Sequence, residues 1–168
     1  MTDAQTGAPN GKSMAIVVSK GTLDWAYPPF ILATTAAAMD VEATLFFTFY
    51  GLSLLLKELD PQISAIGNPA MKMPFNGTRL GMPNLVAVLP GATAATTAMM
   101  KKMIEKKGVA SIAELRDAAL ESGVKLVACR MTMDLFEYRE EDMIDGVTFG
   151  GAATYLERAL EADVNLFV

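Results

Sequence analysis

The sequence predicts an α/β fold with a mostly parallel sheet of about five strands. Residues 14–19 form a short apolar run rich in Ile and Val that ends at Lys20-Gly21, a pattern typical of a buried parallel strand. Residues 42–49 are rich in aromatic and β-branched residues, which predicts a second strand. A helix is expected between them, and this order predicts a right-handed parallel βαβ unit.

Two prolines set the expected start of that first helix. Pro28 and Pro29 can stand in the first turn of a helix, where backbone N–H groups lack an intrahelical partner, but not in its middle. The regular helix is therefore predicted over residues 28–39.

The remaining elements follow from apolar periodicity and from residues that end helices and strands. Ser111 and Glu114 form a capping box that starts one helix, which ends near Ser122 before Gly123. Further helices are predicted over residues 52–59, 92–107, 131–136 and 150–162, and further strands over residues 124–128, 145–148 and 164–168. Residues 84–89 could form a strand or the start of a buried helix.

Two segments lack such patterns. Residues 60–84 are rich in Pro, Gly and Asn, which predicts an irregular loop, and a loop of this length in a compact domain is usually functional or mobile. Residues 1–13 are polar, which predicts a disordered tail without a signal peptide, so residues 14–168 are expected to form a single domain. The most apolar stretch, residues 30–39, is too short to cross a bilayer.

The composition narrows the classes of function. The 168 residues carry a net charge of −5, which argues against binding to nucleic acid. Because histidine is absent, a Ser-His-Asp or Cys-His hydrolase site is excluded within one chain, and the single cysteine excludes the usual zinc sites. One cysteine cannot form an internal disulfide, which fits a reducing compartment such as the cytoplasm.

Three predicted strand ends carry the candidate site residues. They are Ser19, Lys20 and Gly21 after the first strand, Tyr50 and Gly51 after the second, and Cys129, Arg130 and Met131 after the strand at residues 124–128. Ligands of open α/β sheets bind outside the carboxyl ends of the strands. These residues are therefore expected to share one edge if the strands are parallel neighbours.

Cys129 is the strongest candidate for chemistry. A thiol between a strand and a helix faces the positive end of the helix dipole, which stabilises a thiolate, and Arg130 or Lys20 could add positive charge. The alternative is a buried structural thiol, because free Cys is among the most buried residue types. Position alone leaves both interpretations open.

Other patterns are less specific. The twelve methionines suit an adaptable binding surface or plain core packing, and no Cys-x-x-Cys pair accompanies them to suggest a copper(I) site. Lys20-Gly21 lacks the glycine spacing of phosphate-binding loops. The acidic run of Glu140, Glu141, Asp142 and Asp145 is typical of a solvated helix start rather than of a metal site. No cofactor is predicted.

The segment GVKLVACRMTMDL, which contains Cys129, resembles the cysteine signature of the DsrE/DsrF-like sulfur-relay family, in particular of its members labelled peroxiredoxin-like. The segments AIVVSKG and LFFTFYGL resemble its first two strands and their turns, and GGAATYLER with the later NLF fits its carboxyl end. The resemblance covers most of residues 14–168.

The resemblance implies a flavodoxin-like three-layer fold, homo-oligomers that are commonly trimers or hexamers, and a cysteine that carries persulfide or thiosulfonate sulfur. Only Cys129 carries over as the sulfur-bearing residue. Because the chain has no second cysteine, release requires an external thiol, such as that of a TusA-like carrier or a rhodanese.

Three hypotheses for function remain. A sulfur carrier or sulfurtransferase requires Cys129 to be accessible or to lie in a shallow pocket. A non-catalytic assembly or binding subunit would bury Cys129 as a structural thiol. A peroxide-reducing enzyme needs a basic cluster beside the thiol, for which Arg130 and Lys20 are the nearest candidates.

Overall fold

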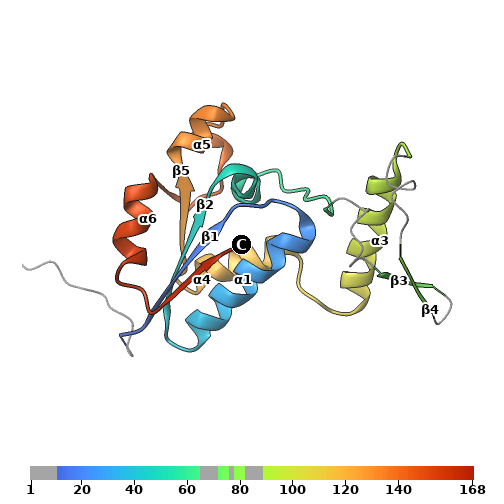
Figure 1. Ribbon diagram of the computed structural model, residues 1–168, viewed down its shortest axis with the longest axis horizontal. Coiled ribbons are helices and arrows are strands. Elements are labelled where there is room, and N and C mark those ends of the chain that lie inside the picture. Colours follow the sequence, from blue (N-terminus) through green and yellow to red (C-terminus); the bar gives the residue numbers. More distant parts are fainter. Residues whose placement is uncertain (1–10, 65–71, 76–77, 82–88) are drawn as a thin grey trace, which may run out of the picture.

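The protein forms the predicted α/β fold around a five-stranded sheet in which all neighbouring strands are parallel (Figure 1). The computed structural model describes residues 11–64, 72–75, 78–81 and 89–168. The strand order is β6-β5-β2-β1-β7. The strands are β1 (Ser13–Val18), β2 (Glu42–Phe47), β5 (Lys125–Cys129), β6 (Thr148–Gly150) and β7 (Val164–Phe167). Of the predicted tail, residues 1–10 lie outside the described residues.

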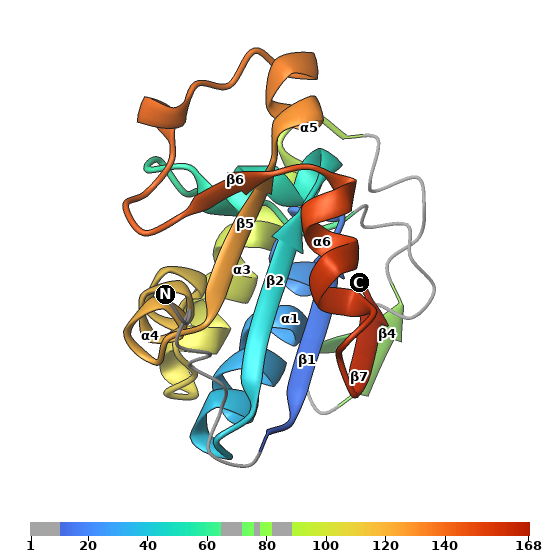
Figure 2. The ribbon, with the colours of Figure 1, turned by 90° about the vertical axis from the view of Figure 1, so that its left-hand side faces the viewer.

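Helices cover both faces of this sheet, which gives three layers. Helices α1 (Leu23–Ala38) and α4 (Ile112–Glu121) lie on one face, and the short helix α6 (Ala152–Ala159) lies on the other (Figure 2). The carboxyl edge carries the 3₁₀ segments η1 (Phe49–Leu55) and η2 (Glu140–Asp142) and helix α5 (Arg130–Leu135). Of the described helices, none is long and apolar enough to span a bilayer.

Alternation along the strands divides the core into two parts. The larger cluster packs the sheet against α1 and α4 and includes Leu126 and Ala128 of β5. Val127 and Cys129 of the same strand point to the opposite face, toward α6, and belong to a smaller cluster. Odd- and even-numbered residues of β5 therefore lie on opposite faces of the sheet, and Cys129 lies on the face that α6 covers.

Helix α1 begins at Leu23 rather than at the predicted Pro28, and both prolines lie inside it. Leu23, Ala26 and Phe30 recur at helical spacing and are buried against the sheet. The burial of this apolar face outweighs the backbone hydrogen bonds that the prolines cannot donate.

The segment predicted as a helix over residues 52–59 is instead the 3₁₀ segment η1, which ends at Leu55. Its backbone leaves the helical path because residues 55–57 hydrogen-bond to residues 142–144, with Ile144 N donating to Leu55 O at 2.9 Å and Lys57 N donating to Asp142 O at 3.0 Å. The buried Arg116 of α4 also donates to the carbonyls of Leu54 and Leu56. These hydrogen bonds fix the direction in which the chain leaves η1 after Leu55.

Four further predictions concern residues 60–148. The strand expected at residues 145–148 is β6, which begins at Thr148 because Gly146 adopts a left-handed turn (φ 86°). The loop predicted over residues 60–84 contains an antiparallel hairpin of β3 (Lys72–Phe75) and β4 (Thr78–Gly81). The ambiguous segment at residues 84–89 lies almost entirely outside the described residues. The predicted capping box of α4 is confirmed, with Glu114 N donating to Ser111 Oγ.

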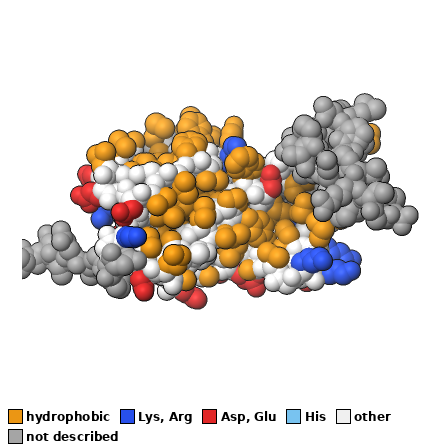
Figure 3. All heavy atoms as spheres, turned by 60° about the horizontal axis from the view of Figure 1, so that its bottom comes forward, with side chains coloured by type: hydrophobic (Ala, Val, Ile, Leu, Met, Phe, Trp, Pro, Cys, Tyr) orange, Lys and Arg blue, Asp and Glu red, His pale blue; other side chains and the backbone are white. Residues whose placement is uncertain are grey.

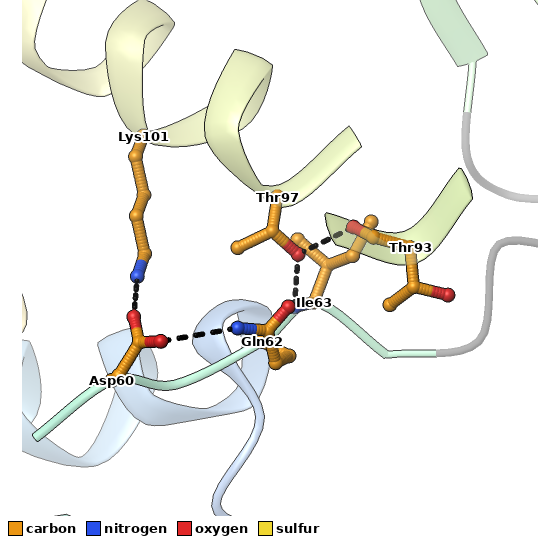
Figure 4. A network of polar contacts seen from close by, with 6 residues as sticks. All are labelled: Asp60, Gln62, Ile63, Thr93, Thr97 and Lys101. Carbon is orange, nitrogen blue, oxygen red and sulfur yellow. Dashed lines mark hydrogen bonds and ion pairs between the residues drawn. The ribbon is translucent and has the colours of Figure 1, made fainter. Parts of the chain in front are cut away.

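Helix α3 (Ala92–Lys106) lies away from the sheet, at the same end of the molecule as the β3–β4 hairpin (Figure 1). Figure 4 shows the polar contacts that join it to the segment after η1: Lys101 pairs with Asp60 at 2.5 Å, and Ile63 N donates to Thr97 Oγ1 at 3.2 Å. Thr97 in turn donates to the carbonyl of Thr93 within the helix. The attachment of α3 therefore combines one exposed ion pair with one buried hydrogen bond.

Candidate functional site

The carboxyl ends of β1, β2 and β5 lie at one edge of the sheet, as the sequence predicts. Strand β2 pairs in parallel with both of the others, and the register aligns Val18 with Phe47 and Phe47 with Ala128. The three loops that follow these strands therefore leave the sheet at the same level. They carry all the candidate residues.

Two of the predicted residues, Gly21 and Gly51, are needed for close backbone approach rather than for chemistry. A Cβ on Gly51 would lie 2.2 Å from the carbonyl oxygen of Val18. A Cβ on Gly21 would lie 2.2 Å from the carbonyl oxygen of Tyr50 and 2.3 Å from Ser53 Oγ. The turn after β1 and the start of η1 are thus in direct backbone contact, which only glycine permits.

A buried pair of hydroxyl groups joins η1 to α5. Thr132 of α5 is fully buried, and its Oγ1 lies 3.1 Å from Oγ1 of Thr48. The same oxygen accepts a hydrogen bond from Phe49 N at 3.3 Å. Phe49 has a left-handed backbone (φ 45°), a conformation that is strained for a bulky residue and that these contacts hold in place.

Cys129 ends β5 and is buried, with 4% of its surface exposed. It pairs across the sheet with Gly150 of β6 and contacts a cluster formed by Val17, Phe46, Val127 and Tyr155. The accessible thiol that a carrier requires is therefore not found in the single chain. The reason is strand parity, which turns this side chain beneath α6 instead of into the open edge.

Tyr155 of α6 forms the outer part of this thiol cluster. Its ring lies 5.3 Å from that of Phe46, measured between centroids, and it is only partly buried. Burial raises the pKa of the Tyr155 phenol above its usual value, so the hydroxyl stays protonated at neutral pH. No residue of α6 is fully buried, so the cover over Cys129 is thin.

The two cations expected near the thiol are engaged elsewhere. Arg130 pairs with Glu140 at 2.9 Å and lies over the ring of Phe149. Lys20 lies over the ring of Trp25, with Nζ 3.2 Å from the centroid. Neither contact supplies the basic cluster that a peroxide-reducing enzyme needs.

The other predicted residues take separate places along the edge. Ser19 donates through Oγ to the carbonyl of Val168 at the end of β7. Met131 is 62% exposed. Two further residues of the acidic run are paired with Arg139: Glu141 with its side chain, and Asp142 with both its backbone N–H and its side chain. The backbone hydrogen bond from Arg139 lowers the pKa of Asp142.

The edge also contains a cavity of about 450 Å³ on the side away from Cys129. Four aromatic residues line it together with Gly21, Thr22 and Ser53; they are Phe49, Tyr50, Phe136 and Tyr138. Gly21 and Tyr50 are the predicted residues that the structure brings together here, whereas Cys129, Arg130 and Met131 do not line this cavity.

Sequence reasoning missed several residues of this edge. The sequence pattern assigns no role to Tyr155 or Tyr138, and it places Thr132 and Phe136 only within the helix predicted over residues 131–136. Alternation along β5 could have placed Cys129 on the face opposite to Leu126 and Ala128. The partner of Cys129 on α6 could not be foreseen in this way, because it depends on how α6 crosses the sheet.

The fold and the edge together define a three-layer α/β domain with its one cysteine at the carboxyl end of a central strand. Comparison with known proteins agrees with this description. The chain belongs to the DsrE/DsrF/DrsH-like family, whose model matches residues 10–167. The resemblance of the cysteine segment to this family is thereby confirmed.

Two relatives and one solved structure are similar to this chain over most of its length. It is 50% identical over 157 residues to "Sulfur carrier protein DsrE2" of Allochromatium vinosum, covering 94% of this chain and 98% of that protein. It is 36% identical over 160 residues to "Uncharacterized protein YrkE" of Bacillus subtilis, covering 94% and 97%. The crystal structure of the ychN protein from E. coli shares the fold, with a TM-score of 0.54 at 13% identity over 94% of this chain and 99% of that one.

The contact between η1 and the turn after β1 predicts unequal effects of one substitution at two glycines. Gly51→Ser places a side chain against the Val18 carbonyl, and we expect it to lower the free energy of unfolding by about 3 kcal/mol. Gly151→Ser is the matched control because its Cβ would meet nothing within 4 Å, and we expect a change within about 0.5 kcal/mol. Urea unfolding measures both; equal losses would contradict the close approach.

The cover over Cys129 predicts that Tyr155 limits access to the thiol. In the folded wild type, iodoacetamide should react slowly, because reaction waits for local opening. Tyr155→Ala should accelerate alkylation by about tenfold or more. Leu156→Ala, on the exposed side of the same helix, should leave the rate unchanged. The same rate in the wild type and in Tyr155→Ala would show that Tyr155 does not cover the thiol.

Proposed function

We propose that this chain is a sulfur carrier that holds persulfide or thiosulfonate sulfur on Cys129 and passes it to a partner thiol. The observation that carries the proposal is the position of the single cysteine, at the carboxyl end of a central strand and next to three converging loops. The 50% identity to a protein named as a sulfur carrier supports it.

Loading is a thiol–disulfide type of exchange. The Cys129 thiolate attacks a sulfane sulfur of a donor such as tetrathionate, the sulfur–sulfur bond of the donor breaks, and thiosulfate leaves while an S-thiosulfonate remains on the cysteine. In the transfer step a partner thiolate attacks the sulfur bonded to Cys129 Sγ, the bond between these two sulfurs breaks, the cargo passes to the partner, and the Cys129 thiolate is the leaving group. Neither step needs a histidine base, because thiolates are the nucleophiles.

Both steps require the thiol to be reached. Since Cys129 lies beneath Tyr155, the carrier works only when α6 or the Tyr155 ring moves aside, either spontaneously or when a partner docks. The thin contact of α6 with the sheet favours such local opening. A TusA-like carrier or a rhodanese is the partner class that the chemistry suits, and the reducing cytoplasm is the compartment that keeps a single thiol free.

The second candidate is an assembly or binding subunit in which Cys129 is structural. The burial of the thiol in an apolar cluster favours this alternative. The two functions differ in one respect that can be measured, because a structural thiol takes up no sulfur while the protein remains folded.

Intact mass tests the carrier directly. The wild type incubated with tetrathionate, and separately with polysulfide, should gain the mass of thiosulfate or of one or more sulfur atoms, and dithiothreitol should remove the gain. Cys129→Ser should gain nothing, because it lacks the only thiol. A gain of equal size on both proteins, or on neither, would contradict the proposal.

We also propose that the chain forms a homo-oligomer, a trimer or a hexamer, through the outer face of α1. Trp25, Ile31 and Leu32 are exposed along this helix and Met39 just after it, and Figure 3 shows apolar side chains spread over the face that carries it. Contiguous apolar surface of this kind is typical of an interaction site.

Charge on that face should dissociate the assembly. Leu32→Glu should convert the oligomer to a monomer, because it places a carboxylate in an apolar interface. Leu160→Glu is the matched control on α6, at a leucine that is 84% exposed, and should leave the oligomer intact. Light scattering after size-exclusion chromatography distinguishes the two results. A monomeric wild type would rule out the assembly.

A further inference from the structure

The aromatic cavity at the carboxyl edge is separate from the thiol and has no part in the proposed sulfur chemistry. Cys129 lies among the residues that face α6, whereas the cavity is formed by η1, the turn after β1 and the segment after α5. Its volume of about 450 Å³ lies within the range of small-molecule sites in proteins. The carboxyl edge is also where α/β sheets bind their ligands.

The cavity has an aromatic wall with ring surface left open to solvent. The rings of Tyr50 and Phe136 stack with their centroids 5.8 Å apart and an interplanar angle of 21°, and Tyr138 meets Phe136 edge to face at 6.1 Å. Tyr50 remains 71% exposed and Phe49 47%. Aromatic faces attract flat rings in offset stacks, so this wall favours a planar occupant over a bulky aliphatic one.

One residue of the wall is held in a strained conformation. Phe49 keeps a left-handed backbone in spite of its bulk, and the Thr132 hydroxyl accepts a hydrogen bond from its N–H. Strain of this kind persists where the surrounding structure fixes it and is concentrated at functional sites. The ring of Phe49 is exposed and is available for a bound molecule to pack against.

The chemistry of the lining limits the charge of the occupant. Of the described residues that line the cavity, none is charged, so an ionic group would lose water without gaining a partner. Ser53 Oγ already donates to the carbonyl of Tyr50, so the hydroxyl groups of Tyr50 and Tyr138 are the ones left for one or two hydrogen bonds. The occupant is therefore uncharged, flat and able to form a few hydrogen bonds.

We propose that this cavity binds an uncharged planar ring compound, which stacks on the wall formed by Tyr50 and Phe136. The proposal does not depend on sulfur transfer. Sulfur transfer does not require this ligand, and binding of the ligand does not require sulfur transfer.

Binding of 2-naphthol to the full chain tests this site. Saturation-transfer NMR and a fluorescence titration should detect binding to the wild type, and Tyr50→Ala and Phe136→Ala should each weaken it about fivefold to tenfold. Phe167→Ala is the matched control, because it removes an exposed ring on β7 that is outside the cavity, and should leave the affinity unchanged. Thermal unfolding of each variant verifies that the fold is intact.

Two related probes test the chemical class. Decahydro-2-naphthol has the same hydroxyl without a flat ring, and naphthalene-2-sulfonate adds a charge; both should bind more weakly than 2-naphthol. No binding of 2-naphthol to the wild type, equal affinity in Tyr50→Ala and Phe136→Ala, or equal affinity for the three probes would overturn the proposal. Sulfur loading of Phe136→Ala, measured by intact mass, should match that of the wild type, which separates this site from the function of Cys129.

Discussion

The backbone contact between η1 and the turn after β1 holds the carboxyl edge of the sheet together. Gly21 and Gly51 allow main-chain atoms of the two loops to meet where any Cβ would collide with a carbonyl oxygen. From this contact the η1 segment continues to Leu55, where Arg116 fixes its end through the carbonyls of Leu54 and Leu56. The Thr48–Thr132 pair then joins the same segment to α5, directly after Cys129. A shift of this contact would disturb all three loops.

The sheet separates two kinds of chemistry at this edge. On the α6 side, the thiol lies in an apolar cluster under Tyr155, whose pKa is raised by burial. On the α1 side, four aromatic rings surround an open cavity without charged walls among the described residues. A buried thiol is protected from oxidation, and local opening of α6, spontaneous or on docking of a partner, would expose it. The proposed carrier is therefore a gated one.

The positions of the strands could largely be predicted from the sequence. The ends of the helical segments that cover the sheet, and their contacts with it, could not. The apolar runs and the Ser111–Glu114 capping box are local signals, and the structure confirms them. The start of α1 was mispredicted because burial of Leu23 and Ala26 outweighs the local effect of Pro28. The end of η1 was mispredicted because its hydrogen bonds go to residues more than eighty positions away. For the site, the sequence indicates Cys129 and its neighbouring loops, but the position of Tyr155 over the thiol arises only from tertiary packing.

The central claim is that Cys129 takes up sulfur while the protein is folded, and peptide mass mapping tests it most directly. Folded and urea-unfolded samples are exposed to the same amount of tetrathionate, quenched, digested and compared at the peptide that contains Cys129. The account predicts a reducible thiosulfate adduct on this peptide in the folded sample. An adduct that forms only in the unfolded sample would contradict it and would make Cys129 a structural thiol.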